Sequence, residues 1–216
     1  QVLHRFSAHT SIIDIMEGLP PGHLIKQINN YIYNTDSVIG KGCSSFVYKG
    51  SPTSIVGRNS QTKDIVAIKV IDVRSAKNEI EKMLIANEIR ALSTVAHDNV
   101  IKCHEICQTV NNLYVVMDFC EQGSLSDFIK THGRELLIQE SLGDQALAIL
   151  YYIAQGLHHI HSKGFLHRDI KPTNILIRNG VPKIADFGFA VPATDAYTKA
   201  KYNVGSPLYM SPEAYR

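Results

Sequence analysis

The sequence predicts an α+β fold in which a small, strand-rich part precedes a mainly helical part. Between about Tyr33 and Met117, short apolar runs with strand character alternate with one helical segment. After a glycine-containing connector at 118–122, apolar residues recur at helical spacing within residues 123–216. Residues 1–32, interrupted by Pro20-Pro21-Gly22, lie outside both parts as a linker, a regulatory extension or the end of another domain.

The elements of the first part follow in order along the chain. A glycine-containing turn at 39–47 precedes a short β-branched strand at 66–69, which ends in Lys69. The polar residues 51–64 lack periodicity and predict an enlarged turn between two strands. Glu88 lies in a helical segment, where its carboxylate can point from the buried face toward the strand. The apolar stripe of that segment is predicted at Leu84, Ile85, Ile89, Leu92 and Val95.

The second part begins where the apolar strand at 113–117 passes through the connector to a helix start at Ser124. A second helix is predicted at 144–162, and Lys163-Gly164 ends it. Its apolar stripe consists of Leu147, Leu150, Ile153, Ala154, Leu157 and Ile160.

Two short segments of the second part hold residues suited to one kind of chemistry. His167-Arg168-Asp169-Ile170-Lys171-Pro172-Thr173-Asn174 is followed by Asp186-Phe187-Gly188. Phosphoryl transfer needs little covalent chemistry from an enzyme, so positioning and charge neutralisation dominate its catalysis. Asp169 is the candidate base for an incoming hydroxyl, and Lys171 is the candidate partner of the γ-phosphate. Asn174 and Asp186 are the candidate Mg²⁺ ligands.

These segments resemble, residue for residue, the catalytic and metal-binding loops of eukaryotic protein kinases. The resemblance spans Tyr33 to Arg216 and implies a two-lobed protein-kinase-like fold. An N-lobe at 33–117 would contain a small antiparallel sheet with one key helix, followed by a hinge at 118–122. A partial, mainly helical C-lobe would occupy 123–216. Kinases with a lysine two residues after the aspartate resemble the serine/threonine class, which implies Mg·ATP-dependent phosphorylation of Ser and Thr hydroxyls on proteins.

The resemblance also assigns a nucleotide site. Lys69 would bind the α- and β-phosphates and pair with Glu88, nineteen residues later. A loop would cover the phosphates, although Ser45 replaces the third glycine of the family pattern. The hinge would bond the adenine, with Met117 guarding the back pocket and apolar side chains sandwiching the ring. The remaining nucleotide-binding candidates are Ile39, Gly40, Lys41, Gly42, Val47, Ala67, Asp118, Cys120 and Leu176.

Within the family, Phe189-Ala190 after Gly188, together with residues 205–210, resembles the autophagy-initiating Unc-51-like branch. Arg168 is expected to meet a phosphate on the segment at about 189–206. Tyr202 occupies the usual phosphoacceptor position, and Thr198 is the favoured alternative. Ser206 is expected to bridge Lys171 and Asp169.

Composition is that of an ordinary intracellular protein, with 44% hydrophobic and 19% charged residues. A net charge of +2 predicts no nucleic-acid partner, and the absence of an apolar run of eighteen residues predicts no transmembrane helix. The four cysteines have no disulfide spacing, which suits the cytoplasm. A metal site at Cys103, His104 and Cys107, or among the histidines at 158–161, is the less favoured interpretation of those clusters. The sequence identifies no regulatory partner.

Two alternatives to an active kinase remain open. One is a pseudokinase, a nucleotide-binding interaction scaffold without turnover, although every catalytic position is present. The other is a truncated, non-catalytic interaction fragment. The chain starts at Gln1 and stops just after Ser211-Pro212-Glu213, which resembles the family's A-P-E element. The expectation is therefore a fragment that is itself inactive, with an exposed apolar underside on its lower lobe.

Overall fold

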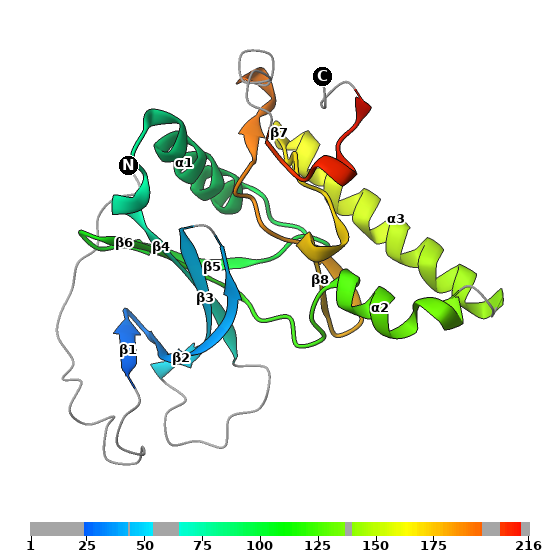
Figure 1. Ribbon diagram of the computed structural model, residues 1–216, viewed down its shortest axis with the longest axis horizontal. Coiled ribbons are helices and arrows are strands. Elements are labelled where there is room, and N and C mark those ends of the chain that lie inside the picture. The colour runs from blue at the N-terminus through cyan, green and yellow to red at the C-terminus, as the bar shows by residue number, and fades with distance from the viewer. Residues whose placement is uncertain (1–23, 43, 54–64, 137–139, 196–203, 213–216) are drawn as a thin grey trace.

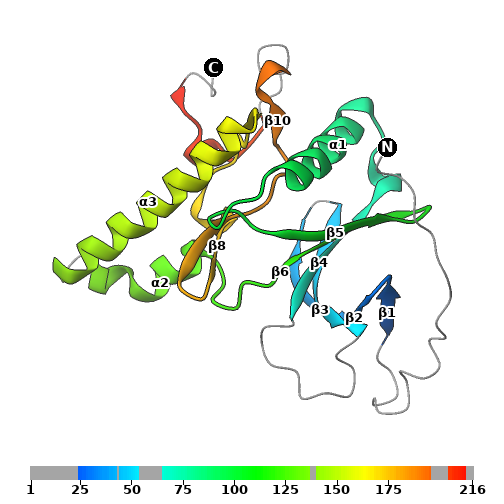
Figure 2. The same cartoon turned by 180° about the vertical axis from the view of Figure 1, so that it is seen from behind.

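A strand-rich lobe and a mainly helical lobe make up the computed structural model (Figure 1), which describes residues 24–42, 44–53, 65–136, 140–195 and 204–212. The first lobe is a six-stranded sheet with helix α1 (Glu79–Thr94). The second contains helices α2 (Leu125–Leu136) and α3 (Glu140–Ser162). Seen from either side, the sheet and these two helices lie at opposite ends of the molecule (Figure 2). The predicted α+β fold is confirmed.

The sheet is antiparallel, in the order β1-β2-β3-β4-β6-β5. Its strands are β1 (Ile25–Ile28), β2 (Tyr31–Lys41), β3 (Ser45–Pro52), β4 (Val66–Asp72), β5 (Cys103–Gln108) and β6 (Asn112–Asp118). Strand β4 lies inside the sheet, with Val47 of β3 on one side of Lys69 and Val115 of β6 on the other. Lys69 is therefore fixed at both neighbours by backbone pairing.

The sheet curls so that its two edge regions meet. Asn29, in the turn between β1 and β2, donates a hydrogen bond from Nδ2 to Oε1 of Glu105 on β5, at 2.5 Å. The curl encloses a cluster of five buried side chains, Tyr33, Val66, Ile68, Tyr114 and Val116. Strand pairing begins at Ile25, within the range that the sequence analysis assigned to an extension.

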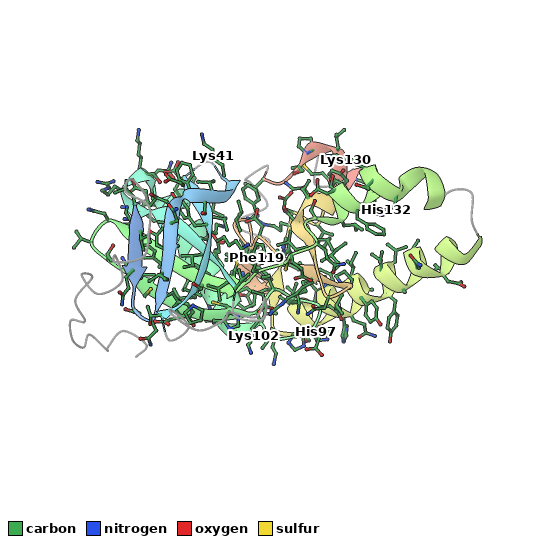
Figure 3. All side chains as sticks on the ribbon, turned by 90° about the horizontal axis from the view of Figure 1, so that it is seen from below. Lys41, His97, Lys102, Phe119, Lys130 and His132 are labelled. Carbon is green, nitrogen blue, oxygen red and sulfur yellow. The ribbon has the colours of Figure 1, made fainter. Side chains whose placement is uncertain are left out.

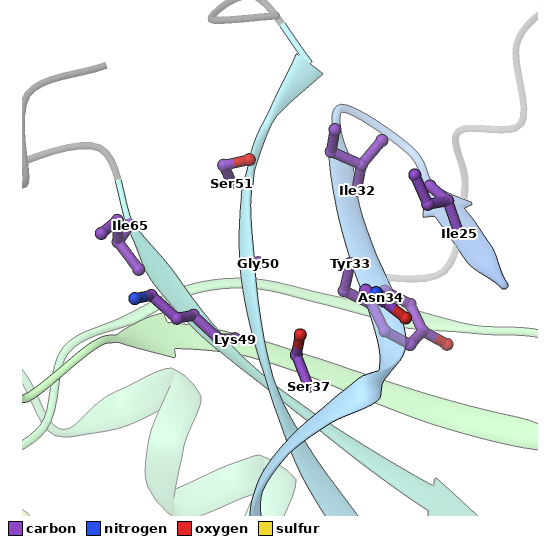
Figure 4. Close-up of a pocket in the computed structure, with 9 residues that line it drawn as sticks. All are labelled: Ile25, Ile32, Tyr33, Asn34, Ser37, Lys49, Gly50, Ser51 and Ile65. Atoms are coloured by element: carbon purple, nitrogen blue, oxygen red, sulfur yellow. The ribbon is translucent and has the colours of Figure 1, made fainter. Parts of the chain in front are cut away.

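A hollow of about 290 Å³ lies on the β1–β3 part of the sheet (Figure 4). None of the candidate catalytic residues lines it. The lining residues are Ile25, Ile32, Tyr33, Asn34, Ser37, Lys49, Gly50, Ser51 and Ile65.

Helix α1 begins after Asn78, whose side-chain oxygen accepts a hydrogen bond from the Glu81 backbone N–H at 2.9 Å. Its buried face differs from the predicted stripe. Asn87 and Ala91 are buried, while Ile85 and Ile89 are only partly buried. Glu88 is at the centre of the buried face, so packing as well as charge fixes its position.

Helix α2 begins with a reciprocal cap at the predicted position. The Asp127 N–H donates to Oγ of Ser124, and the Ser124 N–H and hydroxyl donate to Oδ2 of Asp127. Helix α3 starts at Glu140, four residues before the predicted Asp144, and is followed by Gly164 with a φ of +77°.

Short strands complete the second, mainly helical lobe, which is called the lower lobe from here on. Strands β8 (Ile175–Arg178) and β9 (Val181–Ile184) form one hairpin, and β7 (Phe165–Leu166) pairs with β10 (Val191–Pro192). One continuous core joins α1, β6, α3 and this hairpin. Each fully buried aliphatic or aromatic side chain in such a core contributes about 1.5–3 kcal/mol, so the two lobes share part of their stabilisation.

The outer part of α3 exposes apolar side chains, contrary to the continuous buried stripe that its spacing suggests. Leu147 is 65% exposed and Leu150 61% exposed, while Ile160 further along is fully buried. Tyr151 and Tyr152 are also exposed. No helix in the described ranges is long and apolar enough to span a membrane.

Candidate active site

His167, to which the sequence analysis gave no role, joins the two functional loops. The ring is buried, and Nε2 donates to the Ala185 carbonyl at 3.1 Å while Nδ1 accepts from the Asp169 N–H. This bonding requires a neutral ring protonated at Nε2, and burial lowers the pKa of His167 accordingly. The ring also meets Phe187 edge to face. The sequence signal that could have identified His167 was its position at the start of the segment 167–174, two residues before Asp169.

Asp169 lies in a ring of polar side chains. Lys171 Nζ is 2.8 Å from Oδ2 of Asp169, and Nδ2 of Asn174 donates to the same oxygen at 2.9 Å. Lys171 also donates to the Ser206 hydroxyl at 2.7 Å. Through Lys171, these contacts join Asp169 to the distant Ser206.

The carboxylate of Asp169 stays ionised in this environment. Burial alone would raise its pKa, but the neighbouring Lys171, Ser206 and Asn174 side chains keep the pKa below its ordinary value. Its second oxygen, Oδ1, is buried and has no hydrogen-bond partner among the described residues. A buried oxygen of this kind is an acceptor held in place without a donor.

Lys69 connects the sheet, α1 and the lower lobe. Its Nζ is 2.6 Å from Oε1 of Glu88 and 3.3 Å from Oδ1 of Asp186. Burial alone would lower the pKa of Lys69, yet the two carboxylates outweigh burial and raise it, so the ammonium is charged. The ion pair between Lys69 and Glu88 is thus present, and it extends to a third residue.

The two candidate metal ligands lie close in the backbone. The N–H of Ala185, directly before Asp186, donates to the Asn174 carbonyl at 2.8 Å. The Asp186 side chain is half exposed, and Asn174 uses its side-chain nitrogen toward Asp169, which leaves its amide oxygen for another partner. A carboxylate and an amide oxygen are hard donors, so these two residues fit Mg²⁺.

The phosphate-covering candidates lie on the β2–β3 hairpin. Ile39, Gly40 and Lys41 end β2, and the Gly42 N–H donates to the Ser45 carbonyl at 2.8 Å. Ser45 is buried, and a Cβ placed on Gly42 would meet its hydroxyl oxygen at 2.6 Å. Ser45 therefore occupies the space beside Gly42 in place of the third glycine.

The remaining nucleotide-binding candidates come from both lobes. Ala67 pairs with Met117, and Met117, Cys120 and Leu176 all pack against the shared core. Burial, reinforced by the neighbouring Asp118 charge, raises the pKa of the Cys120 thiol to about 12. The Asp118 side chain is bonded to basic residues and its backbone N–H donates to the Lys102 carbonyl, so the predicted contact with adenine can use only its own carbonyl.

Arg168 is partly buried, with a φ of +66°, and its Nε donates to the Phe189 carbonyl at 2.8 Å. Burial lowers the pKa of its guanidinium. No carboxylate pairs with it among the described residues. Thr198 and Tyr202, the alternative phosphorylation sites, lie outside the described residues.

The clustered cysteines and histidines form no metal site in the part of the chain that the structure describes. Burial raises the pKa values of Cys103 and Cys107 to about 11 each, which marks them as packed thiols. The rings of His159 and His97 lie tilted to each other, with 4.9 Å between their centroids.

The fold brings together side chains of the kinds that phosphoryl transfer uses, namely Lys69, Glu88, Asp169, Lys171 and Asp186. A comparison with known families decides its assignment, since the model of the protein kinase domain matches residues 33–216. The chain belongs to the protein kinase family.

Curated relatives of this kinase chain include three with related names. Serine/threonine-protein kinase atg1 of Dictyostelium discoideum is 33% identical over 198 residues, covering 88% of this chain and 27% of that protein. Serine/threonine-protein kinase ULK1 of Homo sapiens is 31% identical over 198 residues, covering 86% and 17%. Serine/threonine-protein kinase unc-51 of Caenorhabditis elegans is 32% identical over 202 residues, covering 88% and 22%. The chain spans less than a third of the length of each, and these relatives are consistent with an Unc-51-like branch.

Proposed function

We propose that the protein is a serine/threonine kinase that transfers the γ-phosphoryl group of Mg·ATP to Ser or Thr hydroxyls of proteins. The observation that carries this proposal is the Asp169 carboxylate. One of its oxygens is bonded to Lys171 and Asn174, while the other is buried without a partner among the described residues. The ionised carboxylate can accept the hydrogen bond, and finally the proton, of an incoming hydroxyl.

The surrounding side chains divide the remaining work. Lys171 compensates the charge on the transferred phosphoryl group, and Lys69, positioned by Glu88, binds the other phosphates of the nucleotide. Bound Mg²⁺, held by Asn174 and Asp186, would neutralise phosphate charge. In the net reaction the hydroxyl oxygen bonds to the γ-phosphorus, the bond from that phosphorus to the ADP oxygen breaks, and the hydroxyl proton leaves through Asp169.

The Unc-51-like resemblance supports a narrower proposal, that this kinase acts in autophagy-related signalling in the cytoplasm. The supporting features are Phe189-Ala190 after the Asp186 segment and the similarity to the three relatives named above. Regulatory partners are not part of this proposal.

The direct test is a phosphate-transfer assay of the full-length protein beside Asp169→Asn. A positioned general base contributes a factor of about 10²–10⁴, so we expect the variant to lose at least about 100-fold in kcat with nucleotide affinity nearly unchanged. Product analysis should find phosphoserine or phosphothreonine.

Two results would contradict the proposal. Wild-type protein that binds ATP and transfers no phosphate would indicate the scaffold alternative. A variant that keeps more than about a tenth of the wild-type rate would remove Asp169 from the role of base.

A further inference from the structure

A buried cluster of charges lies behind the hinge and has no part in the mechanism above. Asp118, at the end of β6, is only 4% exposed. Its Oδ1 meets Nε2 of His104 at 2.9 Å and the guanidinium of Arg178, and its Oδ2 is 3.7 Å from Nζ of Lys183. One carboxylate thus faces three basic side chains.

The cluster crosses from one lobe to the other. His104 on β5 and Asp118 on β6 belong to the sheet, whereas Arg178 on β8 and Lys183 on β9 belong to the hairpin of the lower lobe. Lys183 Nζ also donates to the Asp98 carbonyl at 2.9 Å, in the loop between α1 and β5. These charged side chains therefore hold together the sheet, the loop between α1 and β5, and the β8–β9 hairpin.

Further bonds tie the hinge to the same hairpin. The side-chain oxygen of Glu121 accepts from the Asn179 N–H at 2.7 Å, and that of Gln122 accepts from the Gly180 N–H at 2.6 Å. The Asp118 side chain lies on the opposite face of β6 from Met117, because neighbouring residues in a strand point to opposite sides. Figure 3 shows Lys41 of the phosphate-covering hairpin on one side of the molecule and Lys102 and His97 on the other.

Asp118 is the centre of this cluster electrostatically as well as in space. Burial on its own would raise the pKa of Asp118, but the bonds from His104 and Arg178 and the charge of Lys183 lower it to about 2. No other carboxylate pairs with Arg178 or Lys183 among the described residues. Loss of Asp118 would leave two partly buried cations without a counter-charge.

The hairpin on the far side of the cluster also contributes to the nucleotide site. Leu176 of β8 is the candidate floor of the adenine site, while Val47 and Ala67 of the sheet are its roof. A nucleotide must contact both lobes, so its apparent affinity depends on how often the two stand at the correct spacing.

We propose that Asp118, Arg178 and Lys183 form an interlobe latch that holds the sheet lobe over the lower lobe and thereby sets the affinity for ATP. Asp118 is a positioning residue in this scheme, since its side chain acts through the hinge and the hairpin and does not touch the nucleotide. The inference rests on the proposed kinase function.

The sharpest test breaks only the contacts between the lobes. In the full-length protein, Arg178→Gln combined with Lys183→Gln leaves the pair of Asp118 and His104 in place. We expect KM for ATP to rise at least about fivefold, with kcat within about twofold of wild type, because only the fraction of correctly spaced lobes changes. Equilibrium titration with Mg·ADP should show the same weakening without any need for turnover.

Two comparisons separate a latch from a general loss of stability. Asp118→Asn should raise KM by a similar factor, and adding it to the double variant should raise KM no further, because all three residues act through one set of contacts. Glu79→Gln, which breaks the exposed ion pair with Lys82 in the same lobe, should leave KM unchanged.

The outcomes are distinct for the two proposals. A wild-type protein without phosphate transfer would contradict the kinase function and leave the ADP titration to judge the latch. An active wild type whose folded double variant binds ADP and ATP with unchanged affinity would overturn the latch and leave the kinase function intact. Full additivity of Asp118→Asn with the double variant would also overturn it.

Discussion

Two residues beside the catalytic groups have a backbone conformation that side chains rarely adopt. Arg168 has a φ of +66° and Asp186 a φ of +62°. Such conformations cost on the order of 1–3 kcal/mol each and persist only where other contacts enforce them. For Arg168 the bond to the Phe189 carbonyl supplies one such contact, and for Asp186 the contact with Lys69 does. Backbone strain therefore lies next to one candidate functional carboxylate, Asp169, and at another, Asp186.

Lys69 and Asp186 touch each other, but their proposed roles can be separated by metal dependence. Lys69→Met and Asp186→Ala should each abolish turnover. Only Asp186→Ala should remove the Mg²⁺ dependence of nucleotide binding, because the carboxylate is the hard oxygen donor that Mg²⁺ prefers.

Calorimetric titration of ATP with and without Mg²⁺ measures this difference. Lys69→Met serves as the control, since it should weaken binding while the effect of Mg²⁺ persists. Equal Mg²⁺ sensitivity in Asp186→Ala and wild type would rule out the metal role.

Motif residues could be placed from the sequence because each lies in a short segment whose spacing is fixed by its chemistry. Asp169, Lys171 and Asn174 are an example, and the structure brings them together within hydrogen-bonding distance. The latch residues could not be found in this way. Asp118, Arg178 and Lys183 come from three strands, so no local pattern joins them before the chain folds.

At the scale of the elements, helix α3 can pack closely against the loop between α1 and β5 because Gly156 has no side chain. A Cβ on Gly156 would lie 2.7 Å from the Asn99 carbonyl oxygen and 3.1 Å from Cδ1 of Ile184. Both neighbours are in the core region where α3 passes beneath the loop and β9. Backbone cannot yield as a flexible side chain can, so the helix itself would have to move.

Gly156→Ala should therefore destabilise the protein by about 1–3 kcal/mol, because the added methyl group overpacks the core. Gly143→Ala is the matched control on the same helix, since a Cβ there meets nothing within 4 Å among the described residues. The control should be stabilising by about 0.5–1 kcal/mol, because alanine favours helix.

Thermal unfolding of the full-length protein, followed by calorimetry, would compare the two variants. A Gly156→Ala protein as stable as Gly143→Ala would show that α3 and the loop can separate freely.

The buried face of helix α1 was only partly predicted. An apolar stripe was sought, and Asn87 was not part of it, whereas Glu88 was expected to point from the buried face toward the strand. Glu88 is buried because Lys69 compensates its charge, a partner nineteen residues away. Hydrophobic periodicity cannot register a burial that depends on a distant counter-charge.

At the scale of the whole molecule, one core runs through both lobes while a second is enclosed by the curled sheet. The shared core includes Val115 of β6, Ile160 of α3 and Phe187 beside the candidate metal ligand. The two lobes consequently cannot separate without exposing apolar surface near the site. The curl itself was not predicted, because the bond that closes it joins Asn29 to Glu105, 76 positions apart.

The hinge thiol has a consequence for chemical probes. A cysteine is a nucleophile as its thiolate, and Cys120 ionises only around a pKa of about 12. Near neutral pH it should react with iodoacetamide at least about 100-fold more slowly than an ordinary cysteine whose pKa is about 8.5. Peptide-level mass spectrometry over a time course measures the rate, with urea-unfolded protein as the fast reference. Labelling of folded Cys120 at the unfolded rate would contradict the expectation.

An electrophilic inhibitor bound at this hinge would have to gain its selectivity from binding geometry and long residence, because the Cys120 sulfur supplies little intrinsic reactivity.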